Sequence, residues 1–114
     1  MSETITFNDF TKIRLCIGTI LSAKLNSKAI KPAYILEIDF GPYGIKTSSA
    51  QLTQNYPQPE QDLVGRQIIA VINFEPKRVA GVKSEVLVLA GVSESHGTVL
   101  LQPAQFIPNG SLIA

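Results

Sequence analysis

The sequence is poor in the residues that build disulfide and metal frameworks, with one cysteine and one histidine among 114 residues. A lone cysteine, Cys16, excludes a disulfide within the chain and fits a reducing compartment. One cysteine and one histidine without ligand spacing do not predict a zinc site. His96, in the turn-like "ESHG", has no partner motif for catalysis. The sequence therefore favours a binding protein over an enzyme, with no catalytic residue, no metal and no cofactor.

Long hydrophobic runs and an excess of one charge are also missing. Apolar stretches such as "QIIAVINF" have the length of a strand and are too short to span a membrane. The N-terminus "MSETITFNDF" lacks the cationic and apolar segments of a signal peptide. The net charge is +1, so any nucleic-acid binding needs a local patch. We expect one cytoplasmic domain over residues 1–114, without membrane insertion.

Residues 13–25, "IRLCIGTILSAKL", alternate between apolar and polar side chains, which predicts a long strand with one buried face. The expected buried face holds Ile13, Leu15, Ile17, Thr19, Leu21, Ala23 and Leu25. Cys16 falls on the opposite face. Gly18, in the middle, indicates a bulge or a tight bend.

Further strands are predicted at short, regular intervals. Residues 33–49 read as a β-hairpin turning at "GPYG", and 66–74 as a central strand. Two more strands are expected at 84–92 and 97–102, and a short helix in "SSAQLTQNY" that ends before the prolines. This order predicts an all-β OB-fold, a five-stranded Greek-key barrel with a short helix and N- and C-terminal extensions.

The densest cluster of cations lies between two predicted strands. Lys77, Arg78 and Lys83 outnumber Glu75, and Lys46 is expected nearby in a barrel. The hydroxyls of Ser48 and Ser84 suit phosphate contacts. Two interpretations stay open: a solvated hairpin, or a surface that follows a nucleic-acid backbone.

Longer motifs carry a family resemblance. "DFTKIRLCIGTILSAKL" resembles the start of the tRNA-binding OB-fold domain that is appended to some methionyl- and phenylalanyl-tRNA synthetases. "GIKTSSAQLTQNY", "IIAVINFEPKRVAGVKSEVLVLAG", "VLLQP" and "IPNGSLI" resemble the CsaA branch of that family, which comprises export-related chaperones. The resemblance implies a homodimer, binding of unfolded preprotein segments for export, and tRNA binding. It leaves contact with the export translocase open.

The chain departs from the tRNA-binding pattern at three positions. Ala80 stands where the family has a basic residue, and Val86 and Leu87 replace a Gly-Met pair. The affinity for nucleic acid rises with the number of phosphates that Lys and Arg neutralise, so the loss of a cation weakens binding. We therefore favour a chaperone with an apolar groove near the dimer seam, and keep a structure-specific tRNA-binding protein as the alternative. The residues predicted to bind nucleic acid are Lys46, Ser48, Lys77, Arg78, Lys83 and Ser84.

Both ends of the chain carry apolar residues that one small barrel is not expected to cover. Exposed apolar patches mark interaction sites, and twofold dimers are the commonest assemblies. The alternative is that both ends cap the barrel of their own chain. The residues predicted at a dimer interface are Ile5, Phe7, Phe106, Ile107, Leu112 and Ile113.

Overall fold

A strongly curved five-stranded antiparallel sheet forms the body of the protein in a computed structural model that describes residues 3–114. The helices are α1 (Phe7–Thr11), the 3₁₀ turn η1 (Gly41–Tyr43) and α2 (Pro59–Asp62). The strands are β1 (Leu15–Leu25), β2 (Tyr34–Asp39), β3 (Ile45–Ala50), β4 (Gln67–Val71), β5 (Lys77–Val79), β6 (Val82–Ser84), β7 (Leu87–Val88), β8 (Ala90–Ser93) and β9 (Gly97–Leu100).

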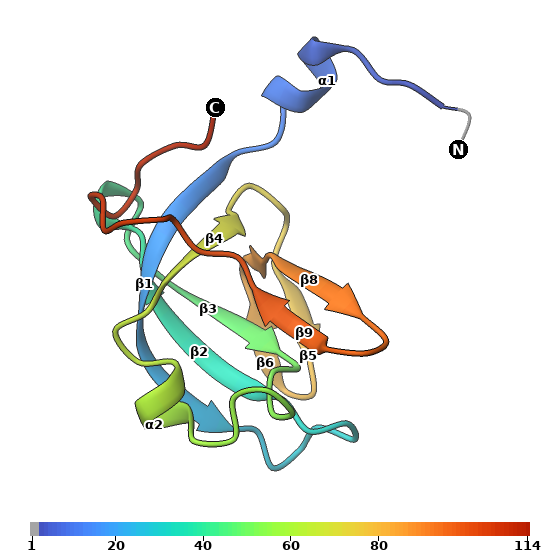
Figure 1. Cartoon of the computed structure of the whole chain (residues 1–114), viewed down its shortest axis with the longest axis vertical. Helices are drawn as coiled ribbons and strands as arrows, with labels where there is room; N and C mark the ends of the chain where they lie inside the picture. Colours follow the sequence, from blue (N-terminus) through green and yellow to red (C-terminus); the bar gives the residue numbers. More distant parts are fainter. Residues whose placement is uncertain (1–2) are drawn as a thin grey trace.

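The main sheet has the order β3-β2-β1-β4-β7, and its two edges approach each other to make a nearly closed barrel (Figure 1). At the closing seam the Glu85 amide donates to the Thr47 carbonyl over 2.7 Å. Two separate hairpins, β5–β6 and β8–β9, complete the strands. The predicted all-β OB-fold architecture is confirmed.

Strand β1 follows simple alternation only in part, although Ile17 and Ala23 are buried as predicted. Cys16 and Ile20 lie in the barrel core, whereas Leu21 is exposed. The register with β2 shifts between Ile20 and Ser22, so a bulge at Leu21 resets the alternation. The prediction that Cys16 lies on the polar face is therefore wrong, and so is the burial expected for Ile13, Leu21 and Leu25.

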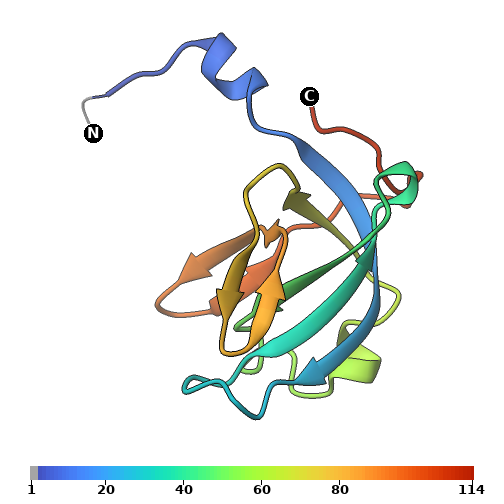
Figure 2. The same cartoon turned by 180° about the vertical axis from the view of Figure 1, so that it is seen from behind.

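The outer side of β1 is buried near Ile17, where the C-terminal tail crosses the strand and then pairs with its edge through a bridge between Cys16 and Leu112 (Figure 1; seen from behind in Figure 2). The Ile17 amide donates to the Ser111 carbonyl, and the Gly110 amide donates to the Ile17 carbonyl over 2.7 Å. Ile17 is consequently buried although it points away from the barrel core. A strand covered on both faces does not show a clean alternation.

Gly18 marks a close approach rather than the bulge. A Cβ built on it would lie 2.6 Å from Cε1 of Phe40 and 2.7 Å from Cγ2 of Ile38. Both of these side chains are fully buried in the core. The missing side chain lets the next strand pack directly onto β1.

The hairpin predicted at 33–49 is confirmed as β2 and β3, joined through η1. β4 is confirmed as a central strand, since it pairs with both β1 and β7. The helix predicted in "SSAQLTQNY" is wrong. The short helix α2 starts at Pro59 instead, because proline suits the first turn of a helix, where its missing N–H costs nothing.

The two ends of the chain extend beyond the barrel. Helix α1 projects away from it in both views (Figures 1 and 2). Thr6 and Asp9 cap this helix by exchanging side-chain hydrogen bonds with each other's backbone amides. The predicted extensions are present, and residues 3–114 include no helix that is long and apolar enough to cross a membrane.

Candidate functional site

The cationic stretch forms a short two-stranded hairpin of β5 and β6, and strand β6 lies beside β3 of the barrel. Its two turn residues, Ala80 and Gly81, both have positive φ, at 48° and 83°. This is the pattern of a two-residue hairpin turn whose twist matches that of its strands. Glycine adopts it freely, whereas the left-handed conformation costs a residue such as Ala80 about 1–2 kcal/mol.

The hairpin separates the predicted cations onto two faces. Arg78 pairs directly with Lys83, so these side chains share one exposed face. Lys77 pairs with Ser84 on the other face, which turns toward the barrel. The compact cluster expected from sequence is therefore divided.

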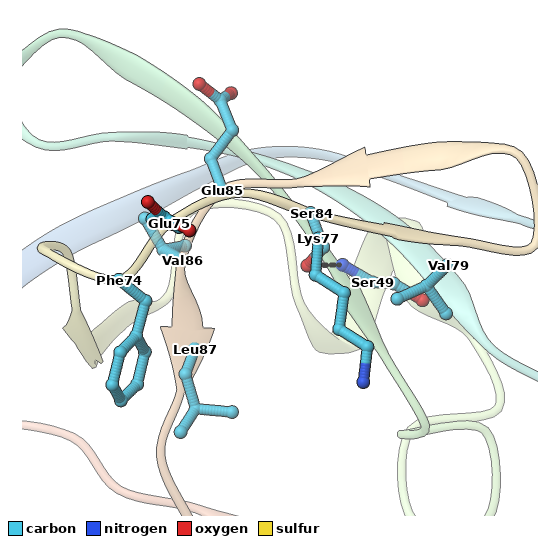
Figure 3. Close-up of a pocket in the computed structure, with 9 residues that line it drawn as sticks. All are labelled: Ser49, Phe74, Glu75, Lys77, Val79, Ser84, Glu85, Val86 and Leu87. Carbon is cyan, nitrogen blue, oxygen red and sulfur yellow. Dashed lines mark hydrogen bonds between the residues drawn. The ribbon is translucent and has the colours of Figure 1, made fainter.

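An apolar hollow of about 380 Å³ lies on the barrel side of the hairpin. Figure 3 shows the side chains of Phe74, Leu87 and Lys77 projecting in one direction, and Glu85 pointing the opposite way. Phe74 is 55% exposed and Leu87 is 50% exposed, although both are large and apolar. The residues that line the hollow are Ser49, Phe74, Glu75, Lys77, Val79, Ser84, Glu85, Val86 and Leu87.

A second hollow of about 190 Å³ adjoins the first, since Ser49 and Leu87 line both. It continues toward the β8–β9 hairpin between the end of β3 and strand β7. We call the two together the β7 groove. The residues that line the second hollow are Ser49, Ala50, Gln51, Leu52, Leu87, Val88, Ala90, Thr98 and Leu100. Sequence reasoning missed the β7 groove, because its apolar residues come from separate strands.

Side chains close the seam between β3 and the β6–β7 segment beside this groove. The Ser84 hydroxyl accepts the Ser49 amide over 3.1 Å, and the Glu85 carboxylate accepts the Thr47 amide over 3.0 Å. The hydroxyl of Ser48 donates to the Val86 carbonyl over 3.2 Å, and Ser48 is buried. In this structure Ser48 is thus a seam residue out of reach of a phosphate, whereas Ser84 stays at the groove wall.

The remaining predicted cation, Lys46, lies apart from the hairpin turn. It pairs with Ile38 near the η1 end of β3. Another cation, Lys28 in the β1–β2 loop, reaches the turn instead: a Cβ built on Gly81 would lie 3.8 Å from its Nζ. Sequence reasoning missed Lys28, which is 49 positions from Lys77 in the chain.

The residues predicted at a dimer interface are mostly exposed in the single chain. Ile5, Phe7, Phe106 and Leu112 are exposed, and Ile107 and Ile113 are half-buried. The two ends also come together, because a hollow of about 310 Å³ is lined by both, including Phe7, Phe10, Leu112 and Ile113. None of the predicted interface residues lines the β7 groove.

Titratable groups do not gather into a reactive site in the described chain. Burial raises the pKa of the Cys16 thiol, and the charge of Arg14 lowers it to a lesser extent. Among residues 3–114 no cluster of three or more His, Cys, Asp or Glu is placed to hold a metal ion. The geometry is that of a binding surface with an apolar groove and a separate cationic face.

Comparison with known proteins places this geometry in a family. The family model described as a putative tRNA binding domain matches residues 15–112. The chain belongs to this family. The match includes the whole barrel and most of the C-terminal tail, and it confirms the resemblance inferred from the sequence motifs.

Members of the tRNA binding domain family occur in proteins of very different length. The chain is 37% identical over 111 residues to the methionine–tRNA ligase of Methanococcoides burtonii, a match of 97% of this chain but 16% of the ligase. Among solved structures it is similar to the chaperone CsaA of Bacillus anthracis, with 54% identity, a TM-score of 0.91, and 98% and 100% of the two chains covered. The CsaA chaperone protein of Picrophilus torridus gives 44% identity, a TM-score of 0.89, and 97% and 100% coverage.

Proposed function

We propose that this protein is a CsaA-like homodimeric chaperone that binds unfolded preprotein segments before their export. The observation that carries the proposal is the β7 groove, where Phe74 and Leu87 lie half-exposed beside each other. Similarity to CsaA chaperones over the full length of both chains supports it. The site of action would be the cytoplasm, where preproteins are still unfolded.

The groove suits an extended apolar segment. Unfolded chains expose apolar side chains that a folded protein hides, and burial of such surface contributes about 25 cal/mol per Å². Strand β7 pairs with β4 along one side. Because the Leu89 amide bonds to the Ile69 carbonyl, the polar backbone groups of Val88 point away from β4. A client backbone that pairs with Val88 would add affinity without demanding a sequence.

The dimer would form through the two chain ends. Phe7 from α1 and Leu112 from the tail are exposed apolar side chains around one hollow. Burial of that hollow against a second copy would remove both from water. Substitution of both by serine should give a monomer in light scattering at micromolar concentration. A dimer of unchanged stability in that variant would place the interface elsewhere.

The chaperone function is tested with a chemically unfolded client and a fluorescent preprotein peptide. We expect the protein to suppress aggregation of the client, and to bind the peptide with an affinity that changes little between 50 and 200 mM salt, since apolar contacts dominate. Failure of both assays with correctly folded protein would contradict the proposal.

A second candidate function is tRNA binding, which the family match supports. The exposed pair of Arg78 and Lys83, with Lys77 and Ser84 behind it, could contact the RNA backbone. Such binding should weaken steeply as salt rises.

The tRNA function is tested by titration of labelled tRNA across the same salt series. We expect the Lys77→Gln/Arg78→Gln variant to bind every tRNA more weakly and to the same extent, because phosphate contacts carry no sequence information. If the wild-type protein does not bind tRNA even at low salt, the tRNA function is contradicted, and the hairpin serves only to line the β7 groove.

A further inference from the structure

Half of the cations of this nearly neutral protein come from two segments distant in the sequence. Residues 26–33 and 77–84 hold five of the ten Lys and Arg residues and no Asp or Glu. The segments meet in space, since the β1–β2 loop lies beside the tip of the β5–β6 hairpin (Figure 2). The five cations are Lys28, Lys31, Lys77, Arg78 and Lys83. These two segments are therefore strongly positive, and the rest of the chain is net negative.

One buried amide side chain joins the two segments. Nδ2 of Asn26 donates to the carbonyl of Ala80 over 3.3 Å, at the hairpin turn. Its Oδ1 accepts the backbone amide of Lys28 over 3.0 Å. Asn26 is itself buried, so it holds both partners from beneath the surface. The Asn26 side chain thus links the backbone of Lys28 directly to the hairpin turn.

The cations converge on this turn without compensation. Nη1 of Arg78 donates to the Gly81 carbonyl over 3.4 Å, and Lys28 passes over the same residue. Lys83 stands directly opposite Arg78, and like charges in that position destabilise a sheet. Within residues 3–114 the one ion pair joins Lys12 and Asp9, so no carboxylate neutralises these cations.

We propose that the β1–β2 loop and the hairpin tip form one surface for the phosphodiester backbone of RNA, with Lys28, Arg78 and Lys83 as contacts and Asn26 as a positioning residue. The inference rests on the second candidate function and extends its site. Uncompensated charge and the left-handed Ala80 both cost stability, and features of that kind collect at binding sites. None of the three contact residues lines the β7 groove or the hollow between the chain ends, so the surface fits an extended polyanion rather than an enclosed small anion.

The test compares two substitutions that each remove one lysine charge. Lys28→Gln lies within the proposed surface, whereas Lys46→Gln lies on β3, four positions or about 13 Å along the strand from Ala50 and the β1–β2 loop end. Binding of a labelled tRNA is measured by fluorescence anisotropy from 50 to 200 mM salt. We expect Lys28→Gln to reduce the slope of log affinity against log salt by about 0.7–0.9, the value for one lost phosphate contact. Lys46→Gln should keep the wild-type slope.

Asn26→Ala separates positioning from charge. This variant keeps every cation, so we expect affinity about fivefold weaker, the effect of one lost ordering hydrogen bond, at an unchanged slope. The urea unfolding midpoint of this variant is measured as well. If the variant does not fold, the comparison of Lys28→Gln with Lys46→Gln alone tests the proposed surface.

Each remaining outcome has a separate meaning. Wild-type protein that binds no tRNA would overturn both the tRNA function and this surface. Normal tRNA binding that is equally insensitive to Lys28→Gln and Lys46→Gln would overturn the surface alone. Binding of a poly-glutamate peptide in place of tRNA, lost in Lys28→Gln, would assign the surface to acidic polypeptides and overturn the RNA proposal.

Discussion

Replacement of Phe74 and Leu87 by serine removes the two large apolar side chains that the β7 groove offers to a client. Full burial of such a side chain contributes about 1.5–3 kcal/mol. Phe74 is 55% exposed and Leu87 is 50% exposed, so about half of that contribution, or about 1 kcal/mol each, is left for the client to gain. The double variant should therefore lose about 2 kcal/mol of binding free energy, or about 30-fold in affinity.

Val92→Ser is the matched control for this prediction. Val92 is 83% exposed on β8 and lies outside the β7 groove. Affinity for a labelled unfolded peptide is measured by fluorescence anisotropy, and urea unfolding verifies that each variant is folded. We expect the control to bind as wild type. A folded double variant with wild-type affinity, or a control that weakens as much, would refute the reasoning.

Three further predictions concern the barrel. Gly18→Ala should reduce the free energy of unfolding by about 1–3 kcal/mol in urea titrations, because its methyl group would overlap the buried ring of Phe40; a stability equal to wild type would contradict the packing. Ser48→Ala should lower the free energy of unfolding by about 1–3 kcal/mol, because the Val86 carbonyl loses its hydrogen-bond partner, and should leave tRNA affinity unchanged. A variant of unchanged stability that binds tRNA more weakly would instead support Ser48 as a phosphate contact. Because burial raises its thiol pKa, Cys16 should react with a thiol reagent at pH 8 mainly after denaturation, and rapid reaction of the native protein would show an open barrel.

The regular parts of the barrel could be predicted because each follows one local pattern. Strand β2 alternates strictly before a glycine–proline turn, and Tyr34, Leu36, Ile38 and Phe40 are all buried as that alternation requires. Strand β4 is apolar after Gln67 and pairs on both sides. Period and turn chemistry are local properties, so the sequence carries them directly.

The predictions that are wrong concern burial and strand boundaries that depend on contacts between residues far apart in the sequence. The bulge at Leu21 and the C-terminal tail over Ile17 determine which side of β1 is buried, and neither is visible in the thirteen residues of that segment. The expected strand at 84–92 is divided, since the seam contact of Glu85 with Thr47 interrupts it before β7. Tertiary contacts of this kind override local preference.

The candidate site was predictable in part. The charge pattern and the family motifs pointed to the β5–β6 hairpin, which does carry Arg78 and Lys83 on an exposed face. The groove was not predictable at its present place, because exposed apolar residues such as Phe74 look like core residues in a sequence. The sequence does not show that Lys28 lies near the hairpin, because that proximity involves the hydrogen bond between Asn26 and the Ala80 carbonyl.

The central claim is that unfolded clients bind in the β7 groove, and the most direct test maps a bound peptide on the isotopically labelled protein by NMR. The account predicts that an extended apolar peptide shifts the amide signals of Phe74, Val79, Leu87 and Val88 and leaves those of Lys28 and Arg78 in place. Shifts confined to the hairpin tip or to the chain ends would contradict it.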